Sequence, residues 1–274
     1  MRKPSSDGWL TSPSGTRSKL IGVNATEVVR TRLLDESQID ALRAWADEVE
    51  AWPSGSHVWG HYAEETPLGP RICRTENVSA CHKGMASLVD GVLQDRAAAA
   101  LGEPAVAFKD KLNYKQPGGA GFGVHQDQAA YPGVDRVLSI LVAIDDCRVE
   151  SGCLWLAGDV HEVLPTDDRG VVRADIASTL AWFPAELAAG DAVMIDGLAP
   201  HYSEANDSAA PRRVFIASYA PESEGYSRAH YYEARLGHMQ SATERDGRFR
   251  ISTLADFEGT EVASGPAPDV CTHG

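Results

Sequence analysis

The chain has 274 residues, and 39 acidic side chains against 25 Lys and Arg give a formal net charge of −14. Nucleic acids and anionic membranes are bound through basic patches, so this balance argues against both as partners. The sequence contains no apolar run of about 18 residues, so it predicts no membrane span. The five cysteines show no CxxC spacing, which favours free thiols in a reducing compartment. These features predict a cytoplasmic protein that acts on a small molecule.

Two helices are predicted before residue 105. Asp35 is a suitable N-cap, and Gln38 three residues later completes a capping box. The apolar residues that follow recur at helical spacing, which predicts an amphipathic helix ending near Pro53. They are Ile39, Leu42, Trp45, Ala46 and Val49. A second helix is expected over about 82–101, with Gly102 as its C-terminal stop.

The remaining pattern is that of short strands. Residues 26–33 predict a short edge strand, and after residue 105 apolar runs alternate with Gly, Pro and Asp clusters. These runs are VAFKDKLNYK, RVLSILVAID, GCLWLAG, DAVMIDG and RRVFIASYA. Many strands without βαβ alternation indicate a sandwich or barrel. We therefore expect a single mainly β domain over 1–274 with flanking helices. Its parts are a helical and hairpin region at about 26–104, a core at about 105–222 and an extension at about 223–274.

Three side chains form a candidate metal site. In GVHQDQAAY, His125 and Asp127 are two residues apart, which places both on one face if the segment is a strand. His201 follows the apolar run DAVMID and offers a second imidazole. Two histidines and one carboxylate leave half of an octahedral coordination sphere open, as in iron(II) oxygenases. An HxD triplet alone is a weak signal, because such pairs also occur on solvated loops.

The segment after His201 makes this interpretation more specific. Ser203 lies two residues further on, and Arg212 begins the strand-like run RRVFIASYA. An inward-facing arginine with a nearby hydroxyl can bind a carboxylate in bidentate fashion. Arg213 points to the opposite face, so one of the two arginines must face inward. Iron ligands together with a dicarboxylate clamp are what a 2-oxoglutarate oxygenase needs.

The ordered motifs resemble the phytanoyl-CoA dioxygenase family over roughly residues 105–235. They are GVHQDQAAY, SGCLWLAGDVH and WFPAELAAGDAVMIDGLAPHYSEANDSAAPRRVFIASY. The resemblance implies a double-stranded β-helix core of the jelly-roll or cupin type. It also implies an enzyme that uses iron(II), 2-oxoglutarate and dioxygen. Because Asp127 supplies a carboxylate, the sequence departs from the family's halogenases, where a small residue replaces it.

The family's roles transfer to matching positions of this sequence. The resemblance implies that His125, Asp127 and His201 bind iron and that Ser203 and Arg212 hold 2-oxoglutarate. Lys111 and Asn113 lie on the strand that enters the site, so they are further candidates for contact with the cosubstrate.

Residues 59–84 carry the clearest indication of a substrate. This block, with KLNYKQPGGAGFGVHQDQAAY and AHYYEARLG, resembles the subgroup that hydroxylates small organophosphonates beside phosphorus, such as the 2-aminoethylphosphonate hydroxylases. In that reading, Arg74 and Asn77 bind the phosphonate while aromatic side chains frame the other end of the substrate. The aromatic candidates are Tyr131, Trp155 and Tyr231. The block is equally compatible with a charged β-hairpin that covers the barrel.

Other functions stay open from the sequence alone. The same chemistry on an amino acid or an antibiotic-biosynthesis intermediate requires the same motifs. A cupin-type hydrolase, isomerase or sensor needs a metal but not Arg212, and a non-catalytic jelly-roll module needs neither. An acyl-CoA substrate calls for a basic or apolar groove, and the acidic composition does not favour it.

Overall fold

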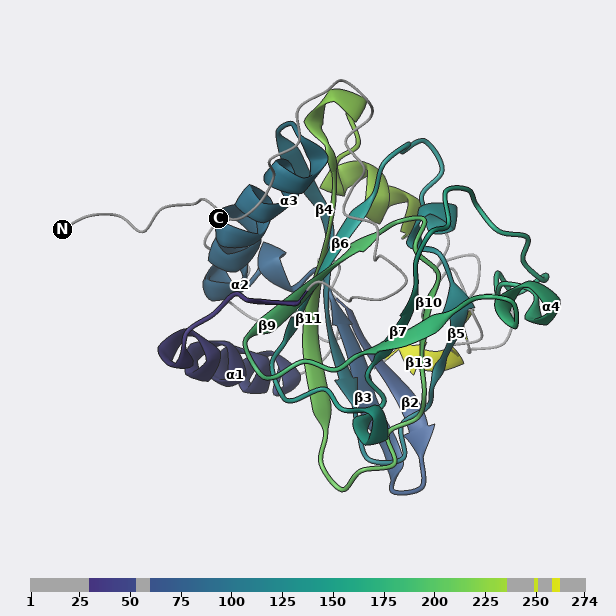
Figure 1. Cartoon of the computed structure of the whole chain (residues 1–274). Coiled ribbons are helices and arrows are strands. Elements are labelled where there is room, and N and C mark those ends of the chain that lie inside the picture. The colour runs from purple at the N-terminus through teal and green to yellow at the C-terminus, as the bar shows by residue number, and fades with distance from the viewer. Residues whose placement is uncertain (1–29, 53–59, 236–248, 251–257, 262–274) are drawn as a thin grey trace.

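Two antiparallel β-sheets that pack face to face form the core of the computed structural model, which describes residues 30–52, 60–235, 249–250 and 258–261 (Figure 1). Leu141, Val193 and Val214 of one sheet share a buried cluster with Leu156 and Ala185 of the other. Apolar side chains that alternate along each strand therefore meet between the sheets.

The larger sheet runs through most of the chain. Within the described residues its strands are ordered β1 (Arg30–Arg32), β9 (Asp191–Asp196), β6 (Leu138–Ala143), β11 (Arg212–Pro221), β4 (Ala105–Lys115), β3 (Gly69–Glu76), β2 (Gly60–Thr66), β13 (Glu258–Glu261) and β12 (Phe249–Arg250). The smaller sheet is ordered β5 (Phe122–His125), β10 (His201–Ser203), β7 (Leu154–Ala157) and β8 (Trp182–Ala185). Neighbouring strands are antiparallel in both sheets. The mainly β fold is as predicted.

Helices cover the outer face of the larger sheet (Figure 1). They are α1 (Glu36–Glu50), α2 (Lys83–Leu88) and α3 (Gln94–Leu101), and the short helix α4 (Ala174–Ala177) lies elsewhere in the chain. Single turns are η1 (Val78–Ala80), η3 (Asp127–Ala130), η4 (Val149–Ser151) and η5 (Glu222–Glu224), and residues 228–235 are also helical.

The first predicted helix is confirmed, and the second is confirmed with one correction. In α1, Asp35 and Gln38 form the expected capping box. The stretch 82–101 is not one helix, because Gly91 has φ −110° and ψ −114° and interrupts it in the wide turn η2 (Val89–Leu93). Glycine tolerates this backbone conformation, which the apolar spacing does not reveal. Gly102 ends α3 with φ 76°, as predicted.

The strand predictions are also confirmed at the positions that the structure describes. The expected edge strand is β1, which pairs with β9, while residues 26–29 and Pro53 lie outside the described residues. Residues 59–84 include the hairpin β2–β3, which extends the larger sheet beside β4. Within the C-terminal extension, β13 pairs with β2, and most of the extension beyond 235 lies outside the described residues.

The expectation of five free thiols is wrong at one position. Cys73 and Cys147 are free and buried, whereas Cys81 is disulfide-bonded. Among the described residues, no helix is long and apolar enough to cross a membrane.

Candidate active site

Strand β4 separates the apolar core from a polar site, because its side chains alternate between the two faces of the sheet. Leu112 and Tyr114 are buried in the cluster under the helices. The opposite face carries Lys109, Lys111, Asn113 and Lys115. Across the ladder, these four pair in order with Ser218, Ile216, Val214 and Arg212 of β11. This inner face of β4 is the floor of the site.

The predicted metal ligands converge above that floor. His125 ends β5, and its backbone is paired directly with that of His201 in β10. The two imidazole centroids are 4.1 Å apart. Asp127 Oδ1 lies 4.0 Å from His125 Nε2 and 3.9 Å from His201 Nε2. Ligand atoms of all three residues lie within 4.8 Å of one another, a spacing that one metal ion can bridge.

Asp127 reaches this point by a different route from the one expected. It does not continue strand β5 but opens the single turn η3. The turn directs the carboxylate back toward the imidazoles. In HxD, the histidine therefore ends a strand and the aspartate begins a turn, and both side chains still reach the same point.

Each candidate ligand is held by a further hydrogen bond. His125 Nδ1 donates to the Gly123 carbonyl at 2.8 Å, and His201 Nδ1 donates to the Ala199 carbonyl at 3.0 Å. Ser139 Oγ donates to Asp127 Oδ2 at 2.7 Å. Both Nε2 lone pairs and Asp127 Oδ1 are thereby left for a metal.

The local charges favour the protonation states that a metal requires. Burial and the adjacent His201 lower the pKa of His125 well below its usual value, so the ring is neutral. Burial alone would raise the pKa of Asp127, but His201, Lys111 and His125 outweigh burial and lower it. Two neutral imidazoles and one carboxylate fit a divalent iron ion.

Two cations line the cavity at one end of the β4 floor. Arg212 and Lys115 are directly opposite in the β4–β11 ladder. Arg212 Nη2 donates to the Gly152 carbonyl at 2.6 Å, and Lys115 Nζ donates to Ser203 Oγ at 2.8 Å. Apolar side chains form the walls between this end and the candidate metal ligands. They include Leu141, Leu154, Val214 and Ile216.

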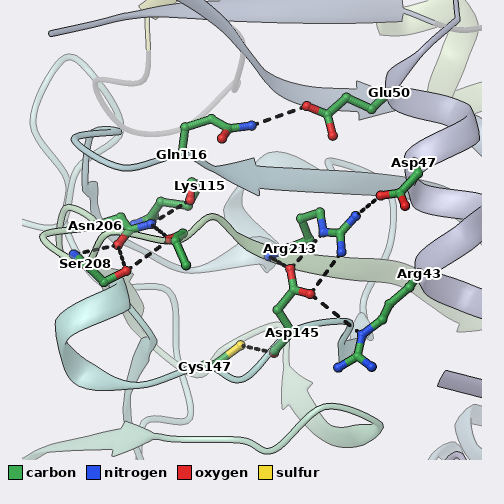
Figure 2. Close-up of polar contacts among 11 residues, drawn as sticks. Arg43, Asp47, Glu50, Lys115, Gln116, Asp145, Cys147, Asn206, Ser208 and Arg213 are labelled. Carbon is green, nitrogen blue, oxygen red and sulfur yellow. Dashed lines mark hydrogen bonds and ion pairs between the residues drawn. The ribbon is translucent and has the colours of Figure 1, made fainter. Parts of the chain in front are cut away.

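Arg213 points the other way, as strand alternation requires. Its Nε donates to Asp145 Oδ2 at 2.8 Å, and its Nη1 pairs with Asp47 of α1 (Figure 2). Arg213 thus joins the outer face of the sheet to a helix, and Arg212 is the inward-facing arginine of the pair.

A denser charged network lies at the other end of the floor. Arg74 of β3 is paired with Asn113 in the ladder, and its Nε donates to Asn113 Oδ1 at 3.1 Å. Glu76 accepts from Arg74 Nη1 at 3.3 Å and from Arg235 Nε at 3.4 Å. Burial would raise the pKa of Glu76, but Arg235, Arg74 and Lys109 bring it down to about 2.

Two buried tyrosines lie behind this network and are not among the residues that line the cavity. Lys109 Nζ donates to the Tyr131 hydroxyl at 2.9 Å and lies 5.2 Å from the centre of the Tyr231 ring. Lys111 lines the cavity between this cluster and Asn113. Tyr131 and Tyr231 are both buried, with ring centroids 5.8 Å apart. The structure therefore brings both predicted tyrosines next to the cationic network.

Two predicted substrate contacts lie elsewhere. Asn77 has a left-handed backbone (φ 59°) at the end of β3, and its side chain accepts from Arg228 instead of facing the cavity. Trp155 is directly opposite Tyr202 in the β7–β10 ladder and stacks on that ring, on the face of the sheet away from His201. The structure thus gives neither assignment support, because side-chain direction depends on strand ends and register.

Sequence reasoning missed Lys109, Lys115, Ser139 and Arg235. A signal for the two lysines was present, since KDKLNYK places residues 109, 111, 113 and 115 on one face of a strand. Ser139 and Arg235 become neighbours of the site only through sheet pairing and the helix at 228–235.

Comparison with known proteins identifies the family. The model for phytanoyl-CoA dioxygenase (PhyH) matches residues 27–214. The chain belongs to this family. A methylphosphonate hydroxylase of Gimesia maris is 36% identical over 249 residues, covering 89% of this chain and 96% of that protein. A 2-aminoethylphosphonate dioxygenase of an uncultured bacterium is 34% identical over 219 residues, covering 77% of this chain and 84% of that protein.

Solved structures agree on the fold. EctD from S. alaskensis, determined with 2-oxoglutarate and 5-hydroxyectoine, has a TM-score of 0.63 at 22% identity over 72% of each chain. The epimerase SnoN, determined with Fe3+ and α-ketoglutarate, has a TM-score of 0.60 at 19% identity, covering 87% of this chain and 91% of that one. The core is thus the double-stranded β-helix expected from the sequence.

Family membership, together with the convergence of His125, Asp127 and His201, defines the class of enzyme. The protein is a non-haem dioxygenase that depends on iron(II) and 2-oxoglutarate.

Proposed function

We propose that the enzyme hydroxylates a small organophosphonate at the carbon next to phosphorus. Two relatives that cover most of this chain are named for phosphonate substrates, which supports the proposal. The observation that carries it within this chain is a surplus of buried cations beside the candidate metal ligands.

Buried cations outnumber buried carboxylates at this end of the site. The cations are Arg74, Lys109, Lys111 and Arg235, and the carboxylates among them are Glu76 and Asp127. Burial, and then the nearby Arg74 and Lys109, lower the pKa of Lys111 well below its usual value. A phosphonate dianion offsets this surplus and suits the planar fork of Arg74.

We assign the roles of individual residues on the same basis. His125, Asp127 and His201 hold iron(II), and Arg212 with Ser203 binds the far carboxylate of 2-oxoglutarate. Bound iron, with 2-oxoglutarate and dioxygen, supplies the oxidising power for C–H hydroxylation and leaves succinate and carbon dioxide.

The remaining residues orient the substrate and exclude water. Arg74, positioned by Asn113 and Glu76, faces the phosphonate together with Lys111. Lys109 adds charge behind them and fixes the Tyr131 hydroxyl, while Tyr231 screens the network from solvent. Exclusion of water strengthens each of these charge interactions.

We propose that the enzyme acts in the cytoplasm.

The test is succinate formation by the iron(II)-loaded enzyme across matched substrates. Methylphosphonate and 2-aminoethylphosphonate should stimulate succinate formation. Acetate, methanesulfonate, β-alanine and taurine, which keep the carbon skeletons but change the anion, should not. Preference for a carboxylate would favour an amino-acid or antibiotic-intermediate substrate, and stimulation by an acyl-CoA alone would support the family's namesake reaction. Either result would overturn the phosphonate assignment.

A matched pair of variants separates site charge from surface charge. Arg74→Met should remove the response to phosphonate, whereas Arg173→Met should retain it. Arg173 is a suitable control because its side chain is about half exposed and pairs with Asp175 on the surface.

A further inference from the structure

Lys115 stands at the cosubstrate end of the site, where the sequence assigned it no role. It ends β4 directly opposite Arg212, and its ammonium lines the same cavity as Arg212 and Ser203. Two cationic side chains therefore converge where the far carboxylate of 2-oxoglutarate is placed.

The charges at this end are not balanced from within. Among the described residues, no carboxylate lies within ion-pair distance of Lys115 or Arg212, although both are largely withdrawn from solvent. In the part of the chain that the structure describes, the ammonium donates to Ser203 Oγ and to the Glu204 backbone carbonyl. The acids with an electrostatic effect on Lys115 are Glu64 and, more weakly, Glu204. Glu64 Oε2 accepts from the Ala120 amide at 3.0 Å. Buried cations without a partner acid indicate a site for an anion supplied from outside.

The hydrogen bond between Lys115 and Ser203 also has a fixed direction. An ammonium group only donates, so Ser203 Oγ must be the acceptor in the 2.8 Å contact. The hydroxyl hydrogen of Ser203 is therefore free to point elsewhere. The cavity side of Ser203 is where a carboxylate oxygen would accept it.

We propose that Lys115 is a second cation of the 2-oxoglutarate subsite, which attracts the far carboxylate and keeps Ser203 oriented as a donor to it. This inference depends on the use of 2-oxoglutarate but not on the identity of the oxidised substrate. It can therefore fail or hold independently of the phosphonate assignment.

A purely structural role for the ammonium is separable from this one. The loop after β10 is tied to β4 through Asn206 Nδ2, which donates to the backbone carbonyl of Lys115 at 2.8 Å (Figure 2). That bond does not involve the lysine side chain. Lys115→Met removes the charge and the side-chain contacts to Ser203 and to the Glu204 carbonyl, while the bond from Asn206 still anchors the loop.

The test measures 2-oxoglutarate binding to iron(II)-loaded protein without oxygen, by calorimetry and by the absorption change on chelation, so no turnover is needed. Lys115→Met should weaken binding by about tenfold to hundredfold, as expected for a lost hydrogen bond to a charged group. Lys83→Met, a change at an exposed position at the start of α2, should leave binding unchanged. Lys115→Arg should restore most of the affinity.

A shortened ligand shows whether the effect belongs to the far carboxylate. 2-Oxopentanoate keeps the metal-chelating end but has a methyl group in place of that carboxylate. Lys115→Met should therefore bind 2-oxopentanoate as the wild type does. An equal loss for both ligands, or no loss for 2-oxoglutarate in a folded variant, would overturn the proposal. If Lys115→Met does not fold, Lys115→Gln, which can still donate to Ser203 but has no charge, replaces it under the same criteria.

Discussion

At one end of the β4 floor, Arg212 and Lys115 face the cavity with no partner acid among the described residues, whereas at the other end Arg74 and Arg235 share Glu76. The positive charge of Arg212 and Lys115 is thus available to a ligand, and apolar walls line the cavity beside it. This arrangement suits a dicarboxylate of one fixed length. The second holds its cations in place through an internal carboxylate and an amide. Such prior positioning reduces the ordering cost when a small anion binds.

This difference indicates that the two ends recognise different anions, with the candidate metal ligands between them. The cosubstrate end depends on a few strong contacts. The substrate end depends on a network, in which the loss of one member changes the pKa and position of the others. The following predictions test this division, beginning with the largest effect.

Removing a candidate ligand should disable both ends together. Asp127→Ala takes away the carboxylate that lies within 4.0 Å of both imidazole Nε2 atoms. We expect loss of bound iron and of all 2-oxoglutarate-dependent succinate formation, measured by metal analysis and a coupled assay. Asp175→Ala, at an exposed surface pair, is the control and should keep both. Full activity in Asp127→Ala would show that iron is held elsewhere.

Two arginine variants should separate the ends. Arg74→Met should lower kcat/KM for the phosphonate by about tenfold to hundredfold, with little change in the 2-oxoglutarate constant. Arg212→Met should do the reverse. Steady-state kinetics with each ligand varied in turn measures both. If either variant shifts the two constants equally, the ends do not act independently.

A smaller effect is expected from the hydroxyl behind Asp127. Ser139→Ala removes the 2.7 Å hydrogen bond to Asp127 Oδ2 and should weaken iron binding by about tenfold. Ser218→Ala is a matched control. Ser218 Oγ lies 3.0 Å from Ser139 Oγ, so this variant removes a neighbouring hydroxyl but leaves the bond from Ser139 to Asp127 intact. Iron titration compares the two variants. Equal affinities would mean that Ser139 does not position the carboxylate.

The smallest effect concerns pH. Burial and Arg212 lower the pKa of Lys115 to about 7. Glu64, Glu204 and Cys153 oppose this shift. Since the protonated amine binds the anion, affinity for 2-oxoglutarate should fall as pH rises, by up to about tenfold from about pH 7 to about pH 8. Calorimetry across this interval measures the change. In Lys115→Arg the slope should disappear, and its persistence would assign the titration to another group.

The sequence was most informative where function depends on short spacings. HxD, the later histidine and the Ser203–Arg212 pair all converge as expected, since each lies on or next to one strand. Two expected substrate contacts, Asn77 and Trp155, do not line the cavity, because side-chain direction depends on strand ends and register. The left-handed backbone turns Asn77 toward Arg228, and the β7–β10 register turns Trp155 outward. The break at Gly91 was also missed, because apolar spacing continues across it.

The most direct test of the central claim follows one substrate through the reaction. The enzyme is supplied with iron(II), 2-oxoglutarate, methylphosphonate and isotopically labelled dioxygen, and the products are identified by phosphorus NMR and mass spectrometry. We predict hydroxymethylphosphonate carrying one labelled oxygen on its carbon, formed together with an equal amount of succinate. Succinate without any oxidised phosphonate, from both methylphosphonate and 2-aminoethylphosphonate, would contradict the assignment.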